Sequence, residues 1–321
     1  MGQMDFEPVH PAHAPAALVQ SAEMSVLTYN VKGLPWPIAR GRGEALREIG
    51  RELATLRREG REPDVVLIQE GFRQEIADLV RESGYRYWAR GPSRGLRNLT
   101  GGGLHVLSDE PIVDVKAAAF RNCAGLDCLA NKGAMLVRLA PEGLPTPVDV
   151  VNTHMNARKA SRAPLSQTLP AHQAQTRELF QFIKAHREPA APMVVGGDFN
   201  IRNSPARYYY QALGRPYTVV GEFCHQPEAA CGDGASDLHA EPWLRRQDLQ
   251  AFQPGAVQVQ PVRAEMLFTG QDRPMLSDHE GYLVRYRLSW SATTLAAYRP
   301  APGVEVKPQF GKWGVKVAWK R

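Results

Sequence analysis

Short apolar runs, broken by glycine, proline and charged residues, predict a chain of strands with a few helices between them. Runs rich in β-branched residues predict buried strands at residues 25–31, 65–68, 104–107, 112–120, 134–139, 148–153, 193–195, 248–252 and 282–288. Apolar residues at helical spacing predict helices at 44–58, 74–81, 171–184 and 208–213. Neighbouring strands are not always separated by a helix, so we expect an α/β (α+β) fold in which two mixed sheets pack face to face with helices outside.

The pattern also predicts three regions along the chain. Residues 1–24 contain three prolines and no basic start followed by an apolar block, so they predict a flexible leader. Residues 25–290 hold the strands and helices and predict a catalytic domain, with loops expected at 157–169 and 221–242. The residues from 291 onward differ in character and predict an added strand or hairpin arm, or a tail docked on the surface.

Polar residues recur where the predicted strands end. The stretch MVVGGDFN places Asp198 and Asn200 two residues apart after a buried strand, so both side chains point the same way along an extended backbone. Other strand ends carry Asn30, Glu70, His154 and the pair Asp278-His279. Each of these alone is typical of a strand cap or a solvated turn. Together they predict a shared cleft, because binding and catalytic groups concentrate on loops held by a rigid scaffold.

The residue types in this set indicate a reaction class. Oxygen ligands such as Glu70, Asp278 and the Asn30 amide suit Mg²⁺, whereas the absence of thiolates or close histidine pairs disfavours zinc. His154 and His279 are suited either to donate to a phosphate oxygen or to move a proton. The set therefore predicts metal-assisted attack of water on phosphorus. No serine elbow or P-loop pattern points to a different mechanism.

Composition narrows the partners only slightly. The 321 residues carry a net charge of +6, which favours anionic partners such as nucleic acid, phospholipid headgroups or small phosphates, although plain solubility charge also explains it. No apolar run approaches the roughly 18 residues of a spanning helix. The cysteines form two close pairs, Cys123/Cys128 and Cys224/Cys231, which favour two disulfides and an oxidising compartment over four reduced thiols.

The motifs at the strand ends resemble those of the endonuclease/exonuclease/phosphatase superfamily, the DNase I-like fold. The matching segments, in the order of that family, are Tyr29-Asn30, Gln69-Glu70, GGLHVLS at 102–108, Asn152-Thr153-His154, GGDFN at 196–200, 246–248 and Ser277-Asp278-His279. Within it, FRNCAGLDCLANKGAM at 120–135 and GGLHVLSDEPI at 102–112 most resemble the bacterial neutral sphingomyelinases. The resemblance implies a four-layer αββα sandwich.

The resemblance also implies a role for each matching residue. It implies that Glu70 and Asn30 hold an essential divalent cation with Asp278 nearby, and that Asp198 activates or orients the water. Asn200 and His154 are implied to contact the scissile phosphate. His279 is implied to be an acid/base or phosphate-binding residue. The carboxylate that steers it is expected to be Asp248, although Leu249 replaces the usual aromatic there, and Asp237 is the fallback.

The resemblance departs from the sphingomyelinases in one segment. Residues 265–275 are short and offer only Leu267 and Phe268 where those enzymes have a longer segment with exposed aromatics. We therefore expect either that another element meets lipid, with Trp36, Trp313 and Trp319 as candidates, or that the substrate is not a bilayer lipid.

The resulting hypothesis is a Mg²⁺-dependent phosphodiesterase, with Mn²⁺ or Co²⁺ as substitutes, that releases phosphocholine from sphingomyelin or a related choline phospholipid. We expect a secreted or periplasmic monomer in peripheral contact with a membrane. The alternatives are a DNase I-like endonuclease that acts on nucleic acid, a phosphoinositide-type phosphatase, and a binding or toxin module with a degenerate site. The basic residues at 158–162 favour the nuclease, and the complete set of strand-end ligands disfavours the degenerate module.

Overall fold

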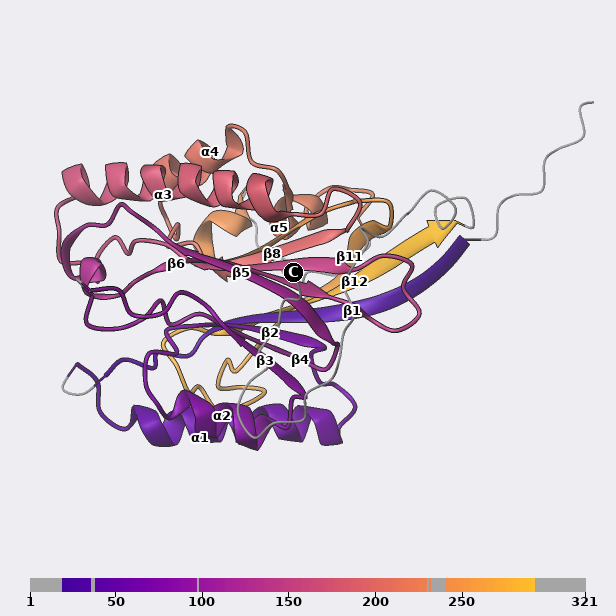
Figure 1. Ribbon diagram of the computed structural model, residues 1–321, viewed down its shortest axis with the longest axis horizontal. Coiled ribbons are helices and arrows are strands. Elements are labelled where there is room, and N and C mark those ends of the chain that lie inside the picture. The colour runs from indigo at the N-terminus through magenta and orange to yellow at the C-terminus, as the bar shows by residue number, and fades with distance from the viewer. Residues whose placement is uncertain (1–18, 36–37, 97, 230, 232–240, 292–321) are drawn as a thin grey trace, which may run out of the picture.

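The computed structural model describes residues 19–35, 38–96, 98–229, 231 and 241–291, and these form two six-stranded sheets packed face to face. Helices cover both outer faces, so the molecule has four layers (Figure 1). The elements in chain order are β1 (Val19–Asn30), α1 (Arg42–Arg58), β2 (Val65–Gln69), α2 (Ile76–Ser83), β3 (Tyr87–Arg90), β4 (His105–Ser108), β5 (Ile112–Ala119), η1 (Gly125–Leu129), β6 (Gly133–Leu139), β7 (Val148–His154), α3 (Leu165–His186), β8 (Met193–Asp198), α4 (Pro205–Ala212), β9 (Thr218–Val219), α5 (Val220–Cys224), η2 (Pro242–Arg245), β10 (Asp248–Gln253), β11 (Gln258–Leu267) and β12 (Gly281–Ser291).

Each sheet is mixed, as the sequence predicts. The first has the order β11-β12-β1-β2-β4-β3 and the second β5-β6-β7-β8-β10-β9. The pairs β1/β2 and β7/β8 are parallel, and the other described pairs are antiparallel. The predicted αββα arrangement is therefore confirmed.

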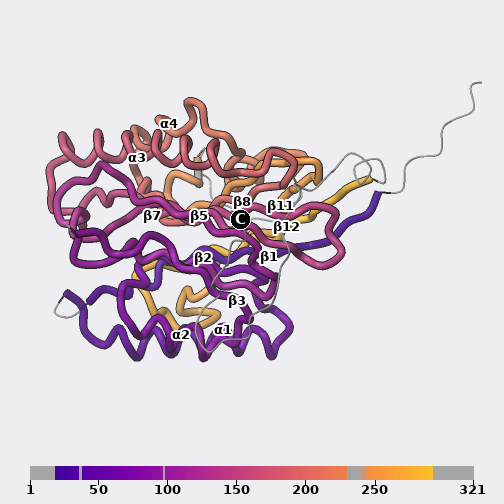
Figure 2. The backbone as a smooth tube through the Cα atoms, in the orientation of Figure 1, coloured from indigo at the N-terminus to yellow at the C-terminus, as the bar shows by residue number. Residues whose placement is uncertain are grey.

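Alternate residues of the central strands face different layers of the core. In β1, Val26 belongs to the apolar cluster between the sheets, whereas Leu27 belongs to the cluster under α1 and α2. A third cluster fills the space between the second sheet and α3. Both faces of these strands are buried, which explains why their sequences are continuous apolar runs rather than alternating patterns. The tube in Figure 2 shows α1 and α2 on one side of the sandwich and α3 on the other.

The helix α1 illustrates how the pattern selects an element. Leu46, Ile49, Leu53 and Leu56 recur every three or four residues, and all four are buried against the first sheet. Glu44 lies in the first turn and two arginines lie in the last turn. These charges interact favourably with the helix dipole at both ends and stabilise the helix. The helix thus presents one apolar stripe inward and a charged face to solvent.

Three boundaries predicted from the sequence are wrong. The first strand begins at Val19, six residues before the predicted start and inside the expected leader, because residues 19–24 pair with β12. The helix α3 begins at Leu165, so it takes the last part of the expected loop at 157–169. Residues 220–224 form α5 at the start of the expected loop at 221–242.

The short segment 265–275 offers no exposed apolar pair in the structure. Leu267 and Phe268 are both buried, and the ring of Phe268 stacks on Tyr29 with the centroids 4.7 Å apart. These two side chains therefore belong to the core. The other expectations about lipid contact and the tail, which concern Trp36, Trp313, Trp319 and residues 292–321, lie outside the described residues.

Both cysteine pairs form disulfides, Cys123–Cys128 and Cys224–Cys231, which confirms the first of the two alternatives for them. Among the described residues, no helix has both the length and the apolar character needed to cross a bilayer.

Candidate active site

The predicted site residues lie at one edge of the sandwich. β1, β7 and β8 end there with Asn30, His154 and Asp198, and Glu70 directly follows β2, whereas the antiparallel strands β10 and β12 begin there. In Figure 1 the arrow of β12 points to the right and β1 runs the opposite way, so this edge is on the left. Residues that are far apart in the sequence are brought together by strand direction alone.

Two glycines allow β8 to reach this edge. A Cβ on Gly197 would lie 2.1 Å from the carbonyl oxygen of Thr153 in β7, and Gly197 has a φ of +147°. A Cβ on Gly196 would lie 2.6 Å from Leu67 of the opposing sheet. Any larger residue would push Asp198 away from both neighbours, which gives a physical reason for the glycines of GGDFN.

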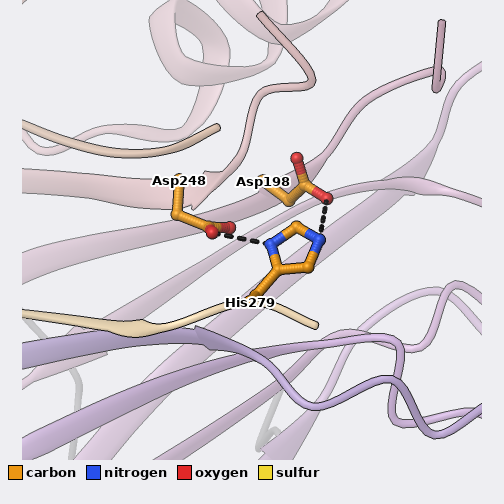
Figure 3. A group of neighbouring side chains, drawn as sticks. All are labelled: Asp198, Asp248 and His279. Carbon is orange, nitrogen blue, oxygen red and sulfur yellow. Dashed lines mark hydrogen bonds and ion pairs between the residues drawn. The ribbon is translucent and has the colours of Figure 1, made fainter. Parts of the chain in front are cut away.

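The centre of the site is a histidine between two carboxylates (Figure 3). Nδ1 of His279 lies 2.7 Å from Oδ2 of Asp248, and its Nε2 lies 3.9 Å from Oδ2 of Asp198. Asp248 and Asp198 are direct partners in the β8/β10 register, so both carboxylates come from the second sheet, whereas His279 comes from the first. The sequence prediction that Asp248 steers His279 agrees with this geometry, and Asp237 lies outside the described residues.

The charges of this group are set by burial and by each other. Burial alone would lower the pKa of His279, but Asp248 and Asp198 outweigh it and raise that pKa to about 10. Burial raises the pKa of Asp198 to about 6, because the effect of His279 offsets it only in part. At neutral pH His279 is therefore an imidazolium with both nitrogens as donors, and Asp198 is an anion of unusually high proton affinity.

His154 lies on the other side of Asp198. Its Nε2 is 3.4 Å from Oδ2 of Asp198 and 4.0 Å from Oε1 of Glu70. Burial, together with the charges of Lys132 and His279, holds the pKa of His154 well below its ordinary value, so the ring is neutral. Its Nδ1 is buried with no hydrogen-bond partner among the described residues.

Asn30 connects the two sheets at the same point. Its Nδ2 donates to Oδ2 of Asp198 at 3.0 Å, and its Oδ1 accepts from the backbone N–H of Lys32 at 3.0 Å. The side chain of Asn30 also hydrogen-bonds Glu70, which lowers the pKa of that carboxyl against the larger, raising effect of its burial. The amide thus touches both the expected metal ligand and the expected water-orienting carboxylate.

Glu70 is held in a strained backbone conformation. Its φ of +58° is uncommon for a residue with a side chain and costs about 1–2 kcal/mol. The turn is fixed on its far side, because Gly71 donates to the carbonyl of Gly103 at 2.8 Å and accepts from Nε2 of His105 at 2.9 Å. The side chain of Glu70 in this turn is 19% exposed.

Asn200 has the same unusual conformation, with a φ of +52°. Its backbone N–H donates to Oδ1 of Asp198 at 2.9 Å, and its Nδ2 donates to the carbonyl of Met155 at 2.9 Å. Arg207, which is fully buried, donates to the carbonyls of Asn156 and Asn200. Arg207 therefore holds together the two turns that follow β7 and β8.

Asp278 is the predicted ligand whose surroundings differ most from the others. Its carboxylate pairs with Nζ of Lys32 at 2.9 Å, and its side chain is 57% exposed. The neighbouring Ser277 donates to the carbonyl of Asn30 at 2.7 Å, so the turn that carries Asp278 is tied to the metal-ligand end of β1. The assignment of Asp278 to the metal remains a prediction.

Sequence reasoning assigned no role to two further residues of the site. The side-chain amide of Gln247 lies 2.9 Å from Nε2 of His279. Lys132 is buried, pairs with Asp127 at 2.9 Å, and its charge acts on Glu70, His154 and Asp198. Lys132 lies in the segment that resembles the sphingomyelinases, so the resemblance marked its position but not its role.

Buried amides join the two sheets directly behind the site. Asn152 of β7 donates to the carbonyls of Ile68 and His105 at 2.9 Å each, and Gln69 donates to Oδ1 of Asn152 at 2.8 Å. Gln250 of β10 donates to the carbonyls of Val26 and Tyr282 at 2.7 Å each. These contacts fix the position of one sheet relative to the other.

The donor set fits a hard divalent cation. Glu70 and the Asn30 amide offer oxygen ligands, which Mg²⁺ prefers. A different group among the described residues, Asp198, Asp248 and His279, also brings three ligand atoms within 4.8 Å of one another. Since His279 is protonated and bonded to Asp248, this group is better suited to proton transfer than to metal binding.

The comparisons agree with the architecture. The sequence matches the Endonuclease/Exonuclease/phosphatase family over residues 27–257. No curated protein sequence matches the chain. Sphingomyelinase C from Streptomyces griseocarneus superposes with a TM-score of 0.62 at 21% identity, covering 82% of this chain and 99% of that one. A double mutant of beta toxin from Staphylococcus aureus with bound magnesium ions gives 0.57 at 15% identity, covering 84% and 100%. D. rerio TDP2 complexed with a single-strand DNA product gives 0.59 at 17%, covering 83% and 99%. At these identities the solved structures show the shared fold.

Proposed function

Because the chain belongs to the endonuclease/exonuclease/phosphatase family, we propose that it is a magnesium-dependent phosphodiesterase that hydrolyses sphingomyelin or a related choline phospholipid to phosphocholine and the lipid moiety. The family is made up of metal-dependent phosphoesterases and nucleases, which supports an enzyme. The observation that carries the reaction type is the His279–Asp248 pair facing Asp198 across the junction of the two sheets.

The residues divide the reaction between a proton acceptor and a proton donor. Asp198 orients a water molecule, and its raised pKa suits it to take the proton as the water oxygen bonds to phosphorus. The bond from phosphorus to the lipid oxygen breaks, and His279, held as an imidazolium by Asp248, gives its proton to that oxygen. One proton is thus taken from the attacking water and one is given to the leaving oxygen.

The remaining residues hold the phosphate and the cation. We assign the neutral ring of His154 and the amide of Asn200 to donate to phosphate oxygens. Glu70 and Asn30 hold the cation, with Asp278 as a further candidate ligand. When bound, Mg²⁺ offsets the negative charge that builds on the phosphoryl oxygens.

The choline-lipid substrate is supported by residues 120–135. This segment resembles the sphingomyelinases, and Lys132 within it acts on three site residues. Two disulfides support a secreted or periplasmic location. We also propose that the protein acts as a monomer.

The test is turnover of sphingomyelin, phosphatidylcholine, single-stranded DNA and a phosphoinositide side by side, with Mg²⁺ and with chelator. We expect phosphocholine release from sphingomyelin that stops on chelation. Cleavage of DNA with steep salt dependence and an inert sphingomyelin would instead establish the nuclease alternative, which the exposed cations Lys159 and Arg162 beside the site favour.

A further inference from the structure

Large apolar side chains that remain exposed are concentrated at the site edge. Among the described residues, ten large hydrophobic residues are exposed, and five of them lie there in the three segments that follow β3, β5 and β7, the last at the first residue of α3. They are Leu96, Leu99, Leu126, Leu129 and Leu165, which together we term the leucine surface. Contiguous exposed apolar groups on a folded protein typically mark an interaction site.

Topology places the three loops together. They follow β3, β5 and β7, and the sheet registers make β3 run parallel to β2 and β5 parallel to β7. All three loops therefore leave the sheets at the side of the molecule where β7 ends at His154 and where Glu70 follows β2. In Figure 1 this is the left-hand edge of the molecule.

Backbone contacts bring the leucines onto one surface. Leu99 donates to the carbonyl of Leu129 at 2.7 Å, and Leu126 donates to the carbonyl of Ser161 at 2.7 Å. Leu126 and Leu129 are three residues apart in the 3₁₀ helix η1, where such side chains share a face. Leu96 is fully exposed and Leu126 is 48% exposed, so the side chains project into solvent.

The same loops are strongly basic. Residues 91–104, 120–132 and 155–165 contain seven lysines and arginines against one acidic residue, Asp127. Asp127 is occupied by Lys132 and by the backbone N–H of Ala157. Arg94, Lys159 and Arg162 are exposed, so cations surround the leucines on the solvent side.

We propose that the leucine surface docks on an anionic phospholipid bilayer, with the leucines entering the headgroup region and the surrounding cations facing lipid phosphates. Exposed leucines on neighbouring segments, with exposed cations in the same segments, match the chemistry of a shallow interfacial anchor. A bilayer partner rests on the proposed function, because a choline phospholipid lies in a bilayer. Leu126 is next to Asp127, which pairs with the site residue Lys132, so docking brings the site to the headgroups.

The test measures co-sedimentation with vesicles of phosphatidylcholine, with and without phosphatidylglycerol and without sphingomyelin. We expect the intact chain to bind better with phosphatidylglycerol present and to release in high salt. The double substitution Leu126→Ser/Leu129→Ser should weaken binding by at least about tenfold, which corresponds to a loss of about 1.4 kcal/mol from the two leucines together. Lys159→Glu, at an exposed position, should weaken it through charge alone and provides a second variant should the first fail to fold.

The matched control is Val19→Ser/Leu213→Ser, which removes two exposed apolar side chains outside the leucine surface. This variant should bind as the parent does. Equal binding by the leucine variant and the control, or no binding by the parent, would overturn the docking surface. These vesicles contain no substrate, so a protein that binds them but releases no phosphocholine from sphingomyelin would overturn the proposed function alone.

Discussion

The two sheets meet in different ways at the centre of the sandwich and at the edge that carries the site. At the centre the contact is apolar, with Val26, Leu67 and Val150 in one cluster. At the edge it is polar and directional, through the amides of Asn152 and Gln250. Apolar packing is non-directional and holds the sheets together, whereas buried hydrogen bonds select one relative position.

The site depends on that relative position. The first sheet supplies Asn30, Glu70 and His279, and the second supplies Asp198 and Asp248. The contacts between Asn30 and Asp198 and between His279 and Asp248 both cross the junction. A small shift of one sheet would therefore separate the proton donor from the acceptor, even if the core stayed intact.

The largest effect on the rate of hydrolysis is expected from site residues that contact each other across the two sheets. Substituting His279→Ala should lower the rate of phosphodiester hydrolysis by about 10²–10⁴-fold, because it removes the proton donor. Asp248→Asn should also lower this rate, since the imidazolium of His279 loses its main stabilising charge. Both are measured as kcat at saturating Mg²⁺, with thermal unfolding as the control for folding. Near-normal kcat in His279→Ala would contradict the assigned role.

A second pair of variants separates two contributions, the relative position of the two sheets and the apolar packing between them. Asn152→Leu removes the side-chain donor to two buried carbonyls and one of the three acceptors of the Gln69 amide, and should cost about 3–5 kcal/mol of stability. Activity of the fraction that stays folded should also fall, since the sheets lose their register.

The matched control is Val150→Ala. Val150 lies two residues before Asn152 in β7 and belongs to the apolar cluster between the sheets. This substitution removes apolar contact alone, so it should lower the free energy of unfolding while leaving kcat of the folded enzyme near that of the parent. If both variants lose activity only in proportion to unfolding, the amide bridge has no positioning role.

A smaller effect is expected on the free energy of unfolding when the pH is lowered. Burial lowers the pKa of His105 to about 4, and protonation would also remove the acceptor that binds Trp88. The unfolded chain takes up this proton near pH 6.5, before the folded one does, so stability is complete above about 6.5 and falls as pH drops toward about 4. The loss from this residue is about 3 kcal/mol. His105→Gln, which retains an acceptor and a donor, should reduce the slope measured by chemical denaturation; an unchanged slope would contradict it.

The sequence predicts the central strands of the two sheets better than the outermost strands. Central strands such as β7 are continuous apolar runs, so they are evident without tertiary information. In contrast, β11 is not predicted because Pro261 and a bulge interrupt its pattern, and β3 is not predicted because only one of its four residues, Ala89, is buried. Strand-end residues and a family resemblance together located the candidate site.

The partners of the site residues could not be predicted in the same way. Gln250 bonds the carbonyl of Val26, 224 residues away, and Asn152 bonds His105, 47 residues away. Nothing in either local sequence distinguishes these amides from surface ones. Likewise Gln247 gains its position beside His279 only when β10 and β12 come from different sheets onto the same edge.

The most direct test of the central claim is the Mg²⁺ dependence of sphingomyelin hydrolysis in the parent, Glu70→Gln and His279→Ala. A site assembled from two sheets, with the cation on Glu70 and proton transfer on His279, predicts two distinct failures. Glu70→Gln should need far more Mg²⁺ for half-maximal rate, whereas His279→Ala should keep the Mg²⁺ midpoint and lose the maximal rate. Parent activity that survives chelation, or a Glu70→Gln midpoint equal to that of the parent, would contradict this account.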